Sequence, residues 1–255
     1  MRPFRSAFVL QLRLIVGDLD YLMPLVTVPM FTIVFLAIVK QAGRGDLAQY
    51  ALLAPVLIAL WQLSLLCSGE ILAEERWLGT IEALLAAPAS YPALVLARIL
   101  AVTTVALVSV PEVLVAGRLF FGVSLHVHHP LALVLTMLAT AFAVSGTALI
   151  MAALFVLTRS ARTFQNSLSY PLYVLGGIFV PVAFLPAWLR PLSAAVFLSW
   201  SGDLLRASLA AEPVHRLGFR LAMICALGLA GLAVGGILLE RVLSRLKRKG
   251  SVGVA

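Results

Sequence analysis

The side chains with the clearest chemistry in this sequence are carboxylates, and three of its 11 acidic residues stand between Glu74 and Pro88. At helical spacing Glu75, Gly79 and Glu82 fall on one stripe, with Thr80 beside the glycine. A second stripe is apolar and consists of Trp77, Ile81 and Leu84. Because glycine has no side chain, another protein can approach this acidic stripe closely. The chemistry that the stripe offers is therefore electrostatic binding of a partner. A solvated helix face is the other interpretation of such a pattern.

A group of histidines offers metal chemistry. His126, His128 and His129 stand close together, and imidazoles in such a cluster can bind zinc or copper. No cysteine or carboxylate lies nearby in the sequence, so a solvated loop is the default interpretation. The two cysteines, Cys67 and Cys225, lie inside apolar runs and form neither a disulfide framework nor a zinc motif.

Two further carboxylates, Glu70 and Glu112, are the ionisable groups closest to the centres of apolar runs. Such groups in a membrane are candidates for function. Both stand near the ends of their runs, so snorkelling to the interface, or pairing with Arg98 or Arg118, explains them equally well.

Catalytic patterns are missing from the sequence. It contains neither the glycine-rich P-loop of nucleotide-binding proteins nor the G-x-S-x-G elbow of serine hydrolases. Polar and aromatic side chains could instead line a substrate path between two protomers, although helix packing explains them as well. These residues are Gln62, Asn166, Tyr170 and Tyr173.

The composition identifies a membrane protein. Of 255 residues, 62% are hydrophobic and 12% are charged, and the mean hydropathy is +1.06. In soluble domains about half of the residues are hydrophobic and about a quarter are charged. The net charge of +8 comes from Arg and Lys between and beyond the apolar runs. Membrane topology explains that distribution better than nucleic-acid binding.

The chain begins with a stretch, residues 2–17, that has an apolar face and a face carrying Arg2, Arg5 and Arg13. This pattern predicts a helix lying on the inner leaflet of the membrane. A signal peptide is the alternative, but no small-residue cleavage site follows.

Six apolar runs are long enough to span a membrane, which takes about 20 residues. They cover 21–39, 51–71, 92–117, 131–157, 168–186 and 217–239. With both termini in the cytoplasm, most Arg and Lys residues lie inside, including the cluster at 245–249. The residues at 187–212 are too broken for a span, and we expect short helices re-entering the outer leaflet there. The sequence therefore predicts one all-α, six-span domain.

The pattern E-x-x-x-G-T-x-E-x-L-x-x-x-P at residues 75–88 resembles the cytoplasmic coupling segment of type-2 ABC exporter permeases. A second resemblance to this family of bacterial drug, lipid and polysaccharide exporters lies between Asn166 and Leu209. Its parts are Tyr170-Pro171, Gly176-Gly177, Phe179-Val180-Pro181, residues 185–189 (LPAWL) and 203–206 (DLLR). With the six spans, the resemblance covers essentially the whole chain, and this second region looks closer to the drug and antibiotic exporters.

The resemblance implies a permease subunit of the bacterial cell membrane that is not itself an enzyme. It implies two copies of an ATP-binding cassette subunit, which hold ATP and Mg²⁺, and a second, identical or different permease protomer. The coupling segment 74–88, through Glu75, Gly79, Thr80 and Glu82, would dock on the ATPase, and a hydrophobic or amphipathic substrate would leave the cell. A lipid-linked or polysaccharide exporter, an ion-driven secondary transporter, and an intramembrane enzyme or scaffold are the alternatives.

Overall fold

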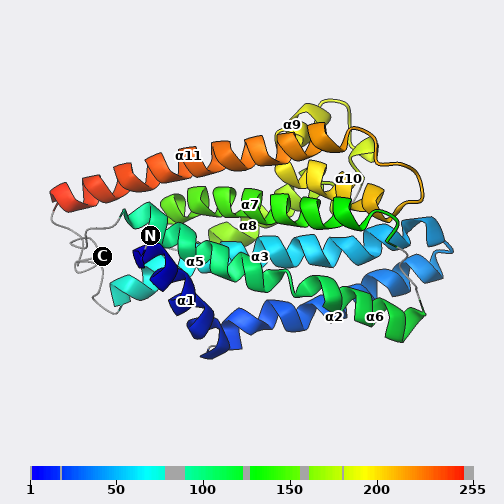
Figure 1. Ribbon diagram of the computed structural model, residues 1–255, viewed down its shortest axis with the longest axis horizontal. Helices are drawn as coiled ribbons and strands as arrows, with labels where there is room; N and C mark the ends of the chain where they lie inside the picture. Colours follow the sequence, from blue (N-terminus) through cyan, green and yellow to red (C-terminus); the bar gives the residue numbers. More distant parts are fainter. Residues whose placement is uncertain are drawn as a thin grey trace.

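A computed structural model of the protein describes residues 2–17, 19–77, 90–122, 127–155, 161–179 and 181–249. The fold is all-α, and no strand occurs in these ranges. The helices form an elongated bundle in which α2 (Leu19–Gln41), α3 (Ala48–Trp77), α7 (Pro130–Phe155) and α11 (Leu217–Lys249) run lengthwise (Figure 1). The predicted all-α, polytopic membrane protein is confirmed.

The two ends of the bundle differ. At one end, here called the α1 end, α1 (Arg2–Gly17) crosses the bundle obliquely, and the last turns of α11 lie at the same end (Figure 1). At the other end, here called the α10 end, lie α9 (Arg190–Ala194) and α10 (Phe197–Leu209). These two are the short helices expected within 187–212.

The third apolar run contains a break that its hydropathy does not reveal. α5 (Tyr91–Ala106) and α6 (Ser109–Phe121) continue one another, but the N–H groups of Leu107 and Val108 bond the oxygens of Thr104 and Val105, a tighter turn than an α-helix. Pro111 explains the break, because its ring clashes with the carbonyl of the residue four positions earlier.

The fifth run also differs from the prediction. α8 covers Ala161–Leu175, and a 3-10 helix, η2, covers Val182–Phe184. The predicted helical span at 168–186 is therefore wrong in its boundaries. Gly176 and Gly177 end the helix. Gly177 has a φ of +67°, a backbone angle that residues other than glycine rarely adopt.

By length and composition, three described stretches can cross a membrane: Tyr91–Phe121, Pro130–Phe155 and Leu217–Arg245. Leu25–Gln41 in α2 and Ala51–Leu65 in α3 are shorter apolar helices. Large apolar side chains such as Val26, Leu131 and Leu229 are exposed on the outside of the bundle. Lipid contact explains such exposure.

The core lies around α3, where Leu57, Leu60 and Trp61 are fully buried. Hydroxyl groups join three helices at its centre. The oxygens of Ser64 on α3 and Thr103 on α5 are 2.9 Å apart, and that of Thr103 is 3.4 Å from Ser145 on α7. Hydrogen bonds of this kind hold helices together in lipid, where apolar surface alone gives no preference for another helix.

Candidate functional site

The expected coupling segment 74–88 is described only at its beginning. α3 continues beyond the predicted end of the second span and includes Glu75 in its last turn. Gly79, Thr80 and Glu82 lie outside the described residues. The chain reappears at Ser90, and α5 starts at Tyr91 with a proline in its first turn, as helices favour. The segment therefore connects two helix ends at the α1 end of the bundle.

The helix α1 is attached to α5 at this end. Arg98 on α5 donates a hydrogen bond from Nε to Oε1 of Gln11 on α1, at 2.6 Å. Gln11 and Ile15 form the buried face of α1, whereas Arg5 and Arg13 are exposed. The side chain of Arg2 lies outside what the structure describes. This hydrogen bond attaches α1 to α5, the helix that begins after residues 78–89.

Three of the four predicted substrate-path residues are exposed, and the fourth is buried. Gln62 is the one exposed side chain between Ala51 and Leu65. Asn166 is exposed on α8, and Tyr170 one turn later is 65% exposed. Tyr173 is buried; its hydroxyl lies near Ser169 and Gln62 but forms no hydrogen bond. Tyr173 therefore lies near Gln62, and a ring contact joins it to Tyr170.

Sequence reasoning missed the aromatic side chains that continue from Tyr170 and Tyr173. Five rings contact one another in series, which we call the aromatic chain. Its centroid distances are 6.0 Å for Phe31 to Phe35, 6.5 Å for Phe35 to Phe179, 5.4 Å for Phe179 to Tyr173 and 6.5 Å for Tyr173 to Tyr170. It links α2 with the turn after α8 and with α8 itself. Most of these pairs meet edge to face, the arrangement that aromatic quadrupoles favour.

A buried arginine holds the turn after α8. Arg206 on α10 donates from Nη1 to the carbonyl oxygen of Gly177, at 3.3 Å, and from Nη2 to Oδ1 of Asp203, at 2.6 Å. The backbone N–H of Ile178 bonds the oxygen of Tyr173 across the same turn. A cation at a helix C-terminus complements the negative end of the helix dipole. Arg206 therefore fixes the position of the residues that follow α8.

Replacing Arg206 with methionine should destabilise the protein by about 2 kcal/mol, because hydrogen bonds from a charged group are lost. Arg190→Met is the matched control. Arg190 also donates to two backbone oxygens, of Ala183 and Leu185, but it is exposed, so water replaces its bonds. Thermal unfolding of the purified variants in lipid nanodiscs measures the difference. Equal losses at the two positions would contradict the role assigned to Arg206.

The histidines have backbone partners. His128 Nδ1 lies 2.9 Å from the oxygen of Leu209, and His129 Nε2 lies 2.9 Å from that of Glu212. His126 lies outside the described residues. Among the residues that are described, no group of His, Cys, Asp and Glu side chains could hold a metal ion. The histidines attach the start of α7 to the end of α10.

The carboxylates of Glu112 and Glu70 belong to α6 and α3. One carboxylate oxygen of Glu112 on α6 is buried and has no hydrogen-bond partner, and the described part of the chain shows no ion pair between Glu112 and Arg118. Glu70 lies within α3, and its side chain is outside what the structure describes.

Three comparisons with known proteins bear on the family of this chain. Two of them, a search of curated proteins and a search of solved structures, found no match. A family model described as "ABC-2 type transporter" matches residues 11–210, from α1 through the end of α10. This match covers most of the chain, and we conclude that the protein belongs to the ABC-2 type transporter family.

Proposed function

We propose that this chain is the permease subunit of an ATP-binding cassette exporter that moves a hydrophobic or amphipathic molecule, such as a drug, an antibiotic or a lipid-like compound, out of a bacterial cell. The family match over residues 11–210 carries the proposal. The sequence has no P-loop, so the energy comes from ATP bound with Mg²⁺ by a partner. Two ATPase copies and a second permease protomer complete the transporter.

The surface between α2, α3 and α8 supports this choice of substrate. The aromatic rings of Phe31, Phe179 and Tyr170 and the amide of Gln62 are exposed. Side chains of this kind contact apolar and neutral polar groups. We assign this surface to the substrate path, at the contact with the second protomer. A lipid-linked or polysaccharide substrate is the alternative within the same family.

The energy source is tested by ATP hydrolysis. The purified chain alone should not hydrolyse ATP, and hydrolysis should appear when it is purified together with its ATPase partner. A variant of the partner without its P-loop lysine is the control and should bind the permease without turnover. Hydrolysis by the permease alone would contradict the proposal.

A secondary transporter driven by an ion gradient is the second candidate, and Glu112 favours it. A buried carboxylate oxygen without a partner is a feature of ion pathways in membranes. In that case Glu112→Gln would abolish transport in the absence of ATP. In the proposed exporter, transport requires ATP whether or not Glu112 is replaced.

In the proposed topology, both termini and the coupling segment lie in the cytoplasm. α1 and the last turns of α11 lie at the same end of the bundle (Figure 1), which supports this arrangement. A reporter fused after Ala255, and a cysteine introduced at Arg162, should both report the cytoplasm, as the distribution of basic residues indicates. A signal from outside the cell at either position would exclude docking of the ATPase at the α1 end.

A further inference from the structure

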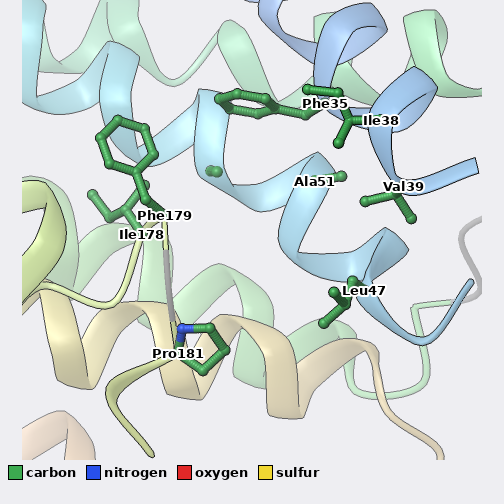
Figure 2. Close-up of a pocket in the computed structure, with 9 residues that line it drawn as sticks. Phe35, Ile38, Val39, Leu47, Ala51, Ile178, Phe179 and Pro181 are labelled. Atoms are coloured by element: carbon green, nitrogen blue, oxygen red, sulfur yellow. The ribbon is translucent and has the colours of Figure 1, made fainter. Parts of the chain in front are cut away.

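An apolar crevice opens at the α10 end of the bundle, next to the aromatic chain (Figure 2). Its volume is about 160 Å³. Three segments form its walls: α2 from Phe35 to Val39, residues 47–54 from the 3-10 helix before α3 into α3, and, distant in sequence, the turn after α8. Figure 2 shows Phe179 and Ile178 across the crevice from Val39 and Leu47.

The wall contributed by the turn after α8 has a defined position. Gly177 is held by the buried Arg206, and Ile178 and Phe179 follow directly. The ring of Phe179 contacts Phe35 on the opposite wall and Tyr173 on α8. Contacts from three helices therefore set the shape of the crevice.

The chemistry of the walls selects the ligand. Every lining side chain is apolar, so the site offers neither charge nor a side-chain hydrogen bond. A polar group placed there would lose its bonds to water without replacement. An apolar protein cavity of about 150 Å³ binds a molecule of the size of benzene. The crevice therefore fits one ring or a short alkyl segment.

The aromatic chain indicates where such a group comes from. It runs from Tyr170, which is exposed, to Phe179 at the crevice. The crevice is thus continuous with the surface assigned above to the substrate path. We propose that the crevice binds the apolar end of the exported molecule, a single ring or short alkyl segment, before release at the α10 end. This inference rests on the proposed function.

Photolabelling of the complete transporter in lipid nanodiscs tests the inference, with a neutral, medium-chain alkyl alcohol carrying a diazirine as the probe. Labelling of the crevice should be saturable, and it should fall during ATP turnover because the occupant is exported. Ala54→Leu fills the crevice from α3 and should lower labelling about tenfold, which corresponds to about 1.4 kcal/mol. Labelling of lipid-facing Leu229 on α11 is the internal reference and should not change.

A second pair of variants keeps the test valid if Ala54→Leu does not fold. Phe179→Ala removes one wall and should lower labelling, whereas Phe184→Ala, at an exposed ring outside the crevice, should not. Labelling equal to that of Leu229, or unaffected by Ala54→Leu and Phe179→Ala, overturns the inference. Saturable labelling that ATP turnover does not change identifies a resident lipid and also overturns it. A failure of the proposed function is recognised separately, because the wild-type complex then does not hydrolyse ATP.

Discussion

Leucine at Gly235 is expected to remove most of the folded protein, whereas leucine at the neighbouring Gly236 should leave it folded. A Cβ atom at Gly235 would lie 2.7 Å from the backbone nitrogen of Ile150 and 2.8 Å from the carbonyl carbon of Leu149. These are backbone atoms of α7, so they cannot turn aside as a flexible side chain does. α7 and α11 would have to separate along the most extensive helix contact in the described structure.

The expected cost at Gly235 is about 3 kcal/mol or more, the upper part of the range for overpacking. That is a large fraction of a typical stability of about 5–15 kcal/mol. Gly236 is the matched control, because a Cβ there meets nothing within 4 Å. Yield after size-exclusion chromatography and thermal unfolding measure both variants. Equal yields would show that α7 and α11 do not pack as described.

The helices of this fold are largely predictable from the sequence, because a membrane requires long apolar runs. The runs at 21–39, 51–71, 131–157 and 217–239 overlap with α2, α3, α7 and α11, although α3 and α11 extend beyond the predicted ends. The boundaries of α8 were not predictable in the same way. Residues 168–186 form a largely apolar run. Hydropathy does not reveal that Gly177 adopts a positive φ or that Arg206, distant in sequence, bonds its carbonyl.

The candidate site was predicted only in part. Tyr170 and Tyr173 were proposed from the sequence as aromatic and polar side chains of a substrate path, and that role stays a prediction. Phe31 and Phe35 were missed, because their spacing in α2 is the same as that of lipid-facing side chains. Their contact with Phe179 depends on how α2 and α8 pack, which no local pattern encodes. The backbone partners of His128 and His129 were unpredictable for the same reason.

The second large effect concerns the proposed coupling segment. Replacing Gly79 with tryptophan and Glu82 with lysine should weaken binding of the ATPase at least about tenfold. The bulky ring would hold the two surfaces apart, and the lysine would place like charge against a basic docking site. Like charges at an interface cost several kcal/mol, and each 1.4 kcal/mol is a factor of ten in affinity. Glu75→Lys, in the last turn of α3, should act in the same direction.

Two comparisons separate this effect from misfolding. The double variant should insert and unfold like the wild type, because the acidic stripe is predicted to contact no lipid. Trp77→Ala changes the opposite, apolar stripe and is the control. It should affect stability in the membrane more than ATPase binding.

The central claim is that a separate ATPase drives this permease through the segment at 74–88. Its most direct test is ATP hydrolysis by the reconstituted complex, measured side by side for the wild type and for the Gly79→Trp, Glu82→Lys double variant at equal permease amounts. We predict hydrolysis in the wild-type complex and a loss of at least about tenfold in the variant, in proportion to the ATPase that remains bound. Wild-type hydrolysis and ATPase binding in the double variant would contradict the coupling role of this segment.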